Sequence, residues 1–341
     1  MAPTHPEPLP KPKRVLITGG AGFIGSHLVD LHIGQGDSVV VVDNCSTGTG
    51  SNLKQHGDAI EFVESDLSEG LQRVCQKDGR FDMIYHLAAA VGVDLVLEDP
   101  IGSIRTNIMQ TDALLEFALK NGSPPTFIAS SSEVYGKPGV SVFSEDDDAI
   151  YGATSVTRWS YAHTKAIDEY LGLAYGQQHG LPVVVGRFFN TVGPRQLGIY
   201  GMVLPRFVQS AMSGEPLRVF GDGKQSRCFC DVRDVVGVLP RLLGCREAFG
   251  RVVNIGSDRS ITILELAQTV IDVLGSSSGI ERVEYSQAYP AGFEDLRHRK
   301  PDLTRLGTLI DFEYRYSLEQ TIRDMAMQIE SMKVVENGVP K

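Results

Sequence analysis

The sequence predicts an α/β fold in which a Rossmann-like, doubly wound parallel sheet is joined to a smaller mixed α/β substrate lobe. Three observations predict it. Short apolar runs alternate with helical patterns through the first half of the chain, a glycine-rich turn follows the first run, and the alternation weakens after Asn190. Apolar strands separated by helices are typical of a parallel sheet that is covered on both faces.

Six apolar runs are expected to be strands, and helical patterns are expected to connect them. The strands span residues 14–18, 38–42, 60–64, 82–87, 126–130 and 182–188. One helix follows the glycine-rich turn and ends near residue 35, and two others span about 101–120 and 160–179. Ligands of such sheets bind at the carboxyl ends of the strands, so the residues after each run are the first candidates for a site.

The second half of the chain is richer in glycine and proline, and its elements are shorter. Helical patterns and short strands return at 204–213, 217–220, 232–243, 252–255, 261–274 and 318–332. We expect a dinucleotide-binding domain over 14–190, to which the chain returns near 231–255, and an interleaved substrate lobe over 191–335. Residues 1–13 are rich in proline and lysine and lack the apolar segment of a signal peptide, which predicts a disordered tail.

The composition is that of a globular protein, since 42% of the 341 residues are hydrophobic and 22% are charged. A net charge of −10 argues against nucleic-acid binding, which normally needs a basic face. No apolar run approaches the ~18–20 residues that a membrane span requires. The odd number and irregular spacing of the five cysteines predict reduced thiols and a cytoplasmic protein, and the scattered histidines predict no metal site.

The glycine-rich turn has the spacing of a dinucleotide site. Gly19 permits a tight turn, Gly22 lets the backbone approach a pyrophosphate, and Gly25 lets helix and strand pack closely. Asp43 lies 18 residues beyond Gly25, at the end of the second strand, where an acid accepts hydrogen bonds from both ribose hydroxyls and repels a 2′-phosphate. We therefore expect NAD, with Asp66 near the adenine; a glycine turn without a ligand is the alternative.

A catalytic set is expected at the end of the fifth strand. The run Ser130–Glu133 ends that strand, and Tyr161 and Lys165 are spaced to lie on one face of a helix. A phenol has a pKa of about 10 and is a poor base at neutral pH, but a nearby ammonium group favours the phenolate. A serine hydroxyl, Tyr161 and Lys165 together suit removal of an alcohol proton while a hydride leaves the same carbon. Taken alone, the tyrosine–lysine pair is also an ordinary helix face.

These motifs resemble the extended short-chain dehydrogenase/reductases, the NAD-dependent nucleotide-sugar epimerase/dehydratase family. The resemblance spans Val15 to about Ile322 and includes TGGAGFIGSH, HLAA, SSSEVYG, YAHTK, RFFNTVGPRQ, GDGKQSRCF and the pair Arg299/Asp302. It implies a tightly bound NAD and transient oxidation of a sugar hydroxyl, usually at C4.

The resemblance also implies roles for particular residues. Ser131, Tyr161 and Lys165 take the catalytic roles, together with Ser132 and Glu133. The residues implied in cofactor binding are Gly19, Gly22, Phe23, Ile24, Gly25, Asp43, Asn44, Asp66, Leu67, Leu87, Ala88, Ala89, Asn107, Tyr161 and Lys165. Those implied around the UDP-sugar are Arg158, Asn190, Arg227, Asp295 and Arg299. Guanidinium groups suit this task because their forked donors match phosphate oxygens.

Glu133 carries the most information about the reaction. Dehydratases of the family have Asp-Glu at this point, whereas this chain has Ser132-Glu133, as in UDP-glucuronate decarboxylases. Arg158 and Arg299 are candidates to hold or release a carboxylate near Glu133. The resemblance thus favours a UDP-glucuronate decarboxylase that forms UDP-xylose or its 4-keto pentose. In the alternative reading, Glu133 is a structural acid and Arg158 forms an ordinary ion pair at a helix start.

Two departures keep a UDP-hexose 4-epimerase of the UDP-glucose/UDP-galactose type open. Val96 replaces a tyrosine that the decarboxylases carry, and residues 201–203 are apolar where an arginine is common. Leu197 and Ile199 likewise stand where glucuronate 4-epimerases tend to have an arginine, and an apolar site suits a neutral hexose. A non-catalytic dinucleotide sensor is a more distant alternative, because such relatives typically lose the tyrosine or the lysine.

A homodimer is expected from the resemblance, through the helix near residue 110 and the helix of Tyr161. Apolar residues on the two helices are compatible with it, and equally with packing on the sheet: Leu114, Leu115, Ala118, Ala166, Tyr170 and Leu173.

Overall fold

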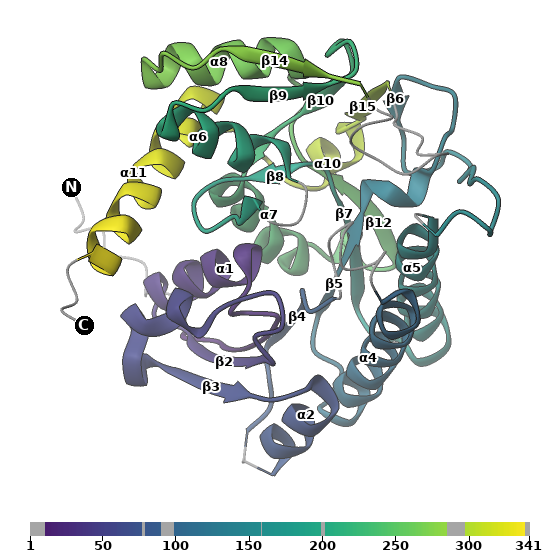
Figure 1. The fold of residues 1–341 in the computed structure, drawn as a ribbon. Helices are drawn as coiled ribbons and strands as arrows, with labels where there is room; N and C mark the ends of the chain where they lie inside the picture. The colour runs from purple at the N-terminus through teal and green to yellow at the C-terminus, as the bar shows by residue number, and fades with distance from the viewer. Residues whose placement is uncertain are drawn as a thin grey trace, which may run out of the picture.

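A seven-stranded parallel sheet forms the centre of the molecule in the computed structural model (Figure 1). The structure describes residues 11–76, 79–89, 99–157, 159–198, 202–284 and 297–337. The strand order is β12-β7-β5-β4-β1-β2-β3. The strands are β1 (Arg14–Thr18), β2 (Ser38–Asp43), β3 (Ile60–Glu64), β4 (Met83–His86), β5 (Thr126–Ser131), β7 (Val183–Phe188) and β12 (Arg251–Ile255). The order reverses between β1 and β4, as in a doubly wound sheet, so the expected fold class is confirmed.

Helices cover both faces of this sheet. On one face lie α1 (Phe23–Gly34) and α7 (Val232–Gly244), and on the other lie α2 (Leu67–Cys75), α4 (Pro100–Lys120) and α5 (Trp159–His179). Strand side chains alternate between the two cores: Val15 and Ile17 pack with α1, whereas Leu16 packs with α4. Burial on both faces explains why these strands are continuous apolar runs in the sequence.

The apolar residues of α4 divide into buried and exposed sets. Leu114, Leu115 and Ala118 are fully buried against the sheet, since residues at this spacing share one helix face. They are therefore not available to a dimer interface, which was one of the two expected uses. The large apolar side chains that are exposed on α4 and α5 are Ile101, Ile104, Met109, Ile167 and Tyr170.

A smaller lobe lies at the carboxyl edge of the sheet (Figure 1). One of its sheets has the order β13 (Ser260–Thr262), β10 (Ser226–Cys228), β15 (His298–Pro301), β6 (Val142–Phe143), and β9 (Leu217–Phe220) pairs with β14 (Ile280–Val283). Helices α6 (Val203–Ser213), α8 (Ile263–Leu274) and α11 (Leu318–Asn337) share an apolar core. Shorter elements are η1 (Gly50–Ala59), η2 (Ser132–Tyr135), β8 (Thr191–Val192), β11 (Cys230–Asp231), η4 (Arg246–Ala248) and α10 (Thr304–Leu309).

Local sequence signals fix several of these helix ends. Asp99 caps α4 by accepting from the Gly102 N–H, and Pro100 occupies the first turn, where its missing N–H costs nothing. Thr262 and Glu265 form a reciprocal capping box at the start of α8, which ends at a left-handed Gly275.

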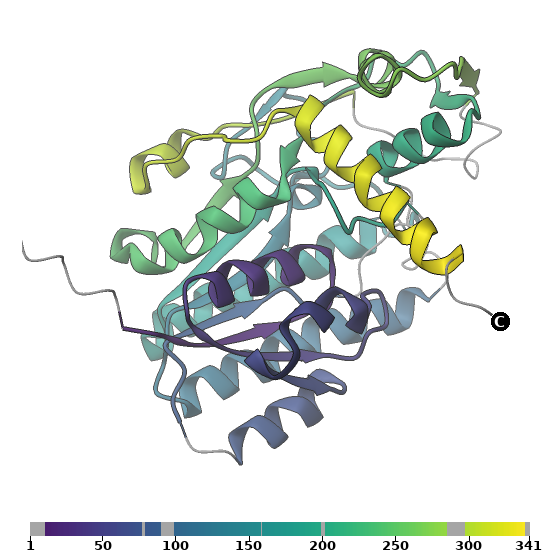
Figure 2. The same ribbon diagram turned by 90° about the vertical axis from the view of Figure 1, so that its left-hand side faces the viewer.

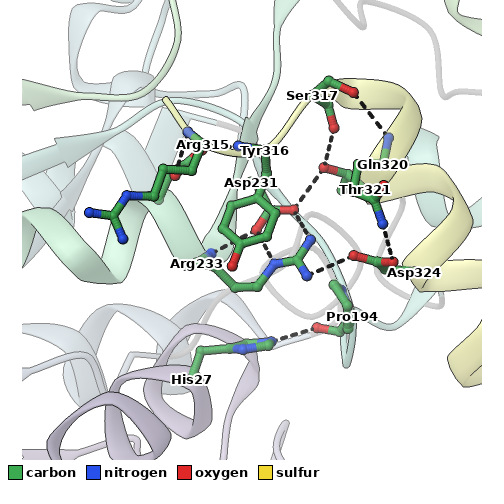
Figure 3. Close-up of polar contacts among 11 residues, drawn as sticks. His27, Pro194, Asp231, Arg233, Arg315, Tyr316, Ser317, Gln320, Thr321 and Asp324 are labelled. Carbon is green, nitrogen blue, oxygen red and sulfur yellow. Dashed lines mark hydrogen bonds and ion pairs between the residues drawn. The ribbon is translucent and has the colours of Figure 1, made fainter. Parts of the chain in front are cut away.

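Helix α11 slants across the small lobe and is tied to the start of α7 (Figures 2 and 3). The buried Asp231 carboxylate accepts from the Thr321 hydroxyl at 2.7 Å and forms an ion pair with Arg233 at 2.7 Å. Arg233 also pairs with Asp324 at 2.7 Å and lies over the Tyr316 ring. We call these five residues the Asp231 network. Strand β11, which contains Asp231, pairs with β8, so the network is linked directly to Thr191 and Val192.

No helix within the described ranges is both long and apolar enough to span a membrane. No cluster of potential metal ligands occurs among the same residues.

Candidate active site

The glycine-rich turn between β1 and α1 leaves no room for side chains. Gly19 has a φ of +73°, and a Cβ there would lie 2.6 Å from the Ala88 nitrogen. A Cβ on Gly25 would lie 2.1 Å from the Gly19 oxygen. Gly22 is the N-cap residue of α1 and has no side chain that could cap the helix. The N–H groups of the first turn, such as those of Phe23 and Ile24, are therefore suited to bind an anion. The turn therefore fits a dinucleotide pyrophosphate, the group for which the sequence predicts it.

The carboxylate of Asp43 is held beside this turn by backbone donors. Its Oδ2 accepts from the Ala21 N–H at 2.9 Å and its Oδ1 accepts from the Cys45 N–H at 2.8 Å. Asn44 extends the contact by donating to Asp66 at 2.8 Å, which joins the ends of β2 and β3. The arrangement leaves the remaining lone pairs of Asp43 suited to ribose hydroxyls.

Other expected cofactor residues lie near this edge, and their side chains differ in access. The side chain of Leu67, the first residue of α2, is buried in the core, so only its backbone can contact a ligand. The segment that follows β4, with Leu87, Ala88 and Ala89, passes against the glycine turn, where the Ala88 N–H donates to the Thr18 hydroxyl at 3.4 Å. Asn107 is buried on α4 and donates to Thr164 of α5 at 3.2 Å.

The expected catalytic residues converge at the end of β5. The Ser131 hydroxyl lies within hydrogen-bonding reach of the Tyr161 phenol and accepts from the Glu133 N–H at 3.2 Å. Lys165 lies one turn along α5 from Tyr161 and donates to the Ala129 carbonyl at 3.0 Å. Ser132 is buried at the start of η2. The sequence therefore brings a phenol, a hydroxyl, an ammonium group and a carboxylate to one strand end.

The electrostatics of this cluster keep Tyr161 protonated at rest. Burial raises the pKa of Tyr161 well above its ordinary value, and the negative charges of Glu133 and Asp168 raise it further. The hydrogen bond from Ser131 lowers the pKa of the same phenol, but by less. A base function for Tyr161 consequently depends on positive charge brought close to the phenol.

A cavity of about 260 Å³ opens between the end of β5 and the small lobe. Glu133, Asn190, Arg227 and Arg299 line it, as the sequence predicts for residues around the substrate. Met202, Val203, Leu204, Phe207, Phe220 and Phe229 add an apolar part to its lining.

Two nearly buried arginines lie side by side in this cavity. Arg227 and Arg299 are register partners on the neighbouring strands β10 and β15. Arg299 forms an ion pair with Glu133 at 2.7 Å, while its Nε is buried and has no hydrogen-bond partner among the described residues. Two adjacent guanidinium groups that are nearly buried are suited to an anion, because their forked donors match carboxylate and phosphate oxygens. The cavity is therefore built for an anionic ligand.

Two further residues of the cavity were not predicted from the sequence. The Thr191 hydroxyl and the Gln196 amide oxygen are buried without a partner among the described residues, and both side chains line the cavity. Buried polar atoms rarely stay unpaired, so they are candidate ligand contacts. The motif RFFNTVGPRQ contains both residues, but it does not show which of its members face a cavity. Arg158, Asp295, Val96 and Ile199 lie outside the described residues, as does residue 201.

A Rossmann-like sheet with a glycine-rich dinucleotide turn indicates an enzyme of the dinucleotide-dependent class. The chain belongs to the NAD dependent epimerase/dehydratase family, whose model matches residues 15–256. The resemblance predicted from the motifs is thus confirmed, and NAD is the cofactor of the family.

Individual relatives narrow the class. A UDP-N-acetyl-alpha-D-glucosaminuronate decarboxylase of Bacillus cytotoxicus is 41% identical over 326 residues, which cover 95% of this chain and 99% of that protein. UDP-glucuronic acid decarboxylase 5 of Arabidopsis thaliana is 34% identical, with 93% and 91% covered. A UDP-glucuronic acid 4-epimerase of Bacillus cereus, solved in complex with NAD, superposes with a TM-score of 0.80 at 26% identity and covers 96% of this chain and 98% of its own. Relatives of this kind support an enzyme over a non-catalytic sensor.

Proposed function

We propose that the chain is an NAD-dependent decarboxylase of a UDP-hexuronate, either UDP-glucuronate or its 2-acetamido analogue. With UDP-glucuronate the product is UDP-xylose or its 4-keto pentose. The observation that carries the proposal is the 2.7 Å ion pair between Glu133 and Arg299, both of which line the cavity, while the charge of Glu133 also acts on Tyr161. The names of the relatives that match nearly the whole chain support it.

The cofactor site proposed here is the turn from Gly19 to Gly25, with its pyrophosphate at the start of α1 and its adenosine ribose on Asp43. Leu87, Ala88 and Ala89 then line the path toward Tyr161. Bound NAD would supply a hydride acceptor for C4 of the sugar: return of the hydride gives UDP-xylose, whereas release of reduced NAD leaves the 4-keto pentose.

In the first step Tyr161 removes the proton of the sugar 4-hydroxyl. Tyr161 acts in this step as the phenolate, after giving its own proton to solvent, and it becomes a phenol when it takes the sugar proton. Lys165, together with the positive charge of an oxidised nicotinamide, would favour that phenolate, and the Ser131 hydroxyl supports the phenol oxygen and the reacting alcohol oxygen. The product is a sugar with a ketone at C4. Ser132, buried beside Ser131, helps to fix the end of the strand on which this geometry depends.

In the second step the bond between C5 and the carboxylate carbon breaks. Its electron pair moves toward the C4 ketone, which lies β to the carboxylate, and carbon dioxide leaves; a proton then adds at C5. Arg299 is positioned to hold the carboxylate, while Glu133 places a like charge beside it. Loss of carbon dioxide removes that charge from the pocket. Arg227, with Asn190, is left to bind the diphosphate.

A UDP-hexose 4-epimerase is the second candidate, and the apolar part of the cavity lining favours it. The side chains of Met202, Val203 and Phe207 offer no partner for a carboxylate, although Arg206 of the same helix also lines the cavity. An epimerase returns the hydride to the other face of the same ketone and needs no acid at position 133.

One set of incubations separates the candidates. The purified protein, with NAD, is given UDP-glucuronate, UDP-N-acetylglucosaminuronate or UDP-glucose, and the products are identified by mass and proton NMR. Loss of carbon dioxide from either uronate supports the decarboxylase. The uronate that loses carbon dioxide faster identifies the group that the enzyme prefers at C2 of the sugar. An unchanged mass with an inverted C4 signal establishes the epimerase and contradicts the proposal.

Glu133→Gln tests the residue that carries the proposal. The substitution keeps the shape of the side chain but removes the charge, and we expect carbon dioxide release to fall by about 10²-fold or more. Oxidation at C4 should persist, which the absorbance of reduced nicotinamide reports in the same sample. Equal losses in both signals would show that Glu133 serves the structure and not the second step.

We also propose a homodimer formed through α4 and α5. Ile101 and Met109 of α4 and Tyr170 of α5 are each more than half exposed, which is unusual for large apolar side chains unless they meet a partner. Sedimentation equilibrium measures the mass directly, and a monomer at micromolar concentration contradicts this part of the proposal.

A further inference from the structure

A buried ion pair lies beneath Tyr161 on the same helix. The Lys165 ammonium donates to the Asp168 Oδ2 at 3.1 Å, and the two side chains are 4% and 0% exposed. Asp168 lies three residues beyond Lys165, so both point from α5 toward the sheet. Burying both charges is tolerable because each neutralises the other.

Among the described residues, Lys165 is the hydrogen-bond partner of the Asp168 carboxylate. Its other oxygen, Oδ1, is buried without a hydrogen-bond partner among the described residues. The neighbouring acid Glu169 is fully engaged elsewhere, with Arg187 at 2.8 Å and the Ser130 hydroxyl at 2.5 Å. Asp168 is thus committed to Lys165.

The imidazole of His86, which lies near Lys165, carries no charge. His86 of β4 is buried and hydrogen-bonds the Thr18 and Thr111 hydroxyls at 2.8 and 3.1 Å. Burial, and next the charge of Lys165, lowers the pKa of His86 to about 3, so its ring is neutral at any working pH. Among the described residues, the carboxylates that act on the Tyr161 phenol are Asp168 of α5 and Glu133 of η2, which pair with Lys165 of α5 and Arg299 of β15.

These four charges form two balanced pairs. An unpaired lysine would favour the phenolate at all times, whereas Lys165 next to Asp168 adds little net field. We propose that Asp168 is a positioning residue: it fixes the Lys165 ammonium beneath Tyr161 and keeps the phenol protonated until further positive charge enters the site. This inference rests on the proposed base function of Tyr161.

The pH profile of kcat tests the charge effect. Asp168→Asn removes the negative charge that opposes the phenolate, so Tyr161 becomes a base at lower pH. We expect the acid limb of the profile, measured with whichever UDP-sugar is turned over, to move down by about one pH unit. Glu169→Gln is the matched control, because it removes a neighbouring buried carboxylate that faces Arg187 instead. An unmoved limb in Asp168→Asn, or an equal shift in both variants, overturns the inference.

A double-mutant cycle of melting temperatures tests the pair without any substrate. Asp168→Asn should lower the melting temperature far less in the Lys165→Met variant than in the natural chain. The reason is that the Lys165 charge, which the substitution would otherwise leave unpaired, is absent from that variant. Additive losses overturn the inference. If Asp168→Asn does not fold alone, recovery of the fold in the double variant supports the pair, and failure to recover contradicts it. Failure of the sugar assay, by contrast, bears on the proposed function and leaves this cycle intact.

Discussion

The cofactor edge and the sugar-side cavity of this molecule are built in different ways. At the cofactor edge, Asp43 is held by the N–H groups of Ala21 and Cys45, which lie 22 and 2 residues away. In the cavity, the ion pair of Glu133 and Arg299 joins residues that are 166 apart in the chain. The first region is specified by one continuous strand–turn–helix–strand unit, from β1 to the end of β2. The second exists only after two lobes have packed, so it is the region in which related chains can change their chemistry without losing the cofactor.

The largest effect is expected where the two regions meet. Tyr161→Phe removes the proposed base and its hydroxyl but leaves the glycine turn untouched. Turnover should fall by about 10³-fold, within the range for loss of a general base, while bound NAD is retained. Kinetics together with the nicotinamide released on denaturation measure both quantities.

Tyr175→Phe is the control for this substitution. It removes a phenol from the same helix whose hydroxyl donates to Asp112 at 2.8 Å, away from the cavity. Its turnover should stay within about twofold of the natural chain. A rate near that of the natural chain in Tyr161→Phe would remove the basis of the proposed mechanism.

The difference between the cofactor edge and the sugar-side cavity also explains which features the sequence predicts and which it does not. The sheet class, the glycine turn and the pairing of Tyr161 with Lys165 follow from short periodic patterns, because neighbours in the chain are neighbours in space. Nothing local indicates that Arg227 and Arg299 are register partners, since 71 residues lie between these two arginines in the chain. Asp168 was likewise not singled out, because an acid on a helix is usually solvated.

Loss of the Asp231 network should have the next largest effect, and it acts on stability. Asp231→Asn keeps the shape of the buried side chain but leaves Arg233 with one charged partner instead of two. We expect the free energy of unfolding to fall by about 3 kcal/mol. Denaturant titration measures it.

An exposed ion pair provides the comparison for that loss. Glu69 and Arg73, one helical turn apart on α2, are both more than half exposed, so Glu69→Gln should change the free energy of unfolding by less than about 0.5 kcal/mol. Similar losses in Asp231→Asn and Glu69→Gln would show that α11 is not held to α7 by the network.

The smallest expected effect separates a glycine that the cofactor edge requires from one that it does not. Gly25→Ala places a Cβ against the Gly19 carbonyl oxygen, and backbone cannot move aside as a flexible side chain can. We expect the free energy of unfolding to fall by about 1–3 kcal/mol, with a matching loss of NAD affinity.

Gly237, inside α7, meets nothing within 4 Å, so Gly237→Ala should stabilise the chain by about 1 kcal/mol, since alanine favours a helix interior. Melting curves with and without added NAD compare the two variants. Only Gly25→Ala should lose the shift that NAD produces, because only its methyl group lies in the turn that receives the pyrophosphate.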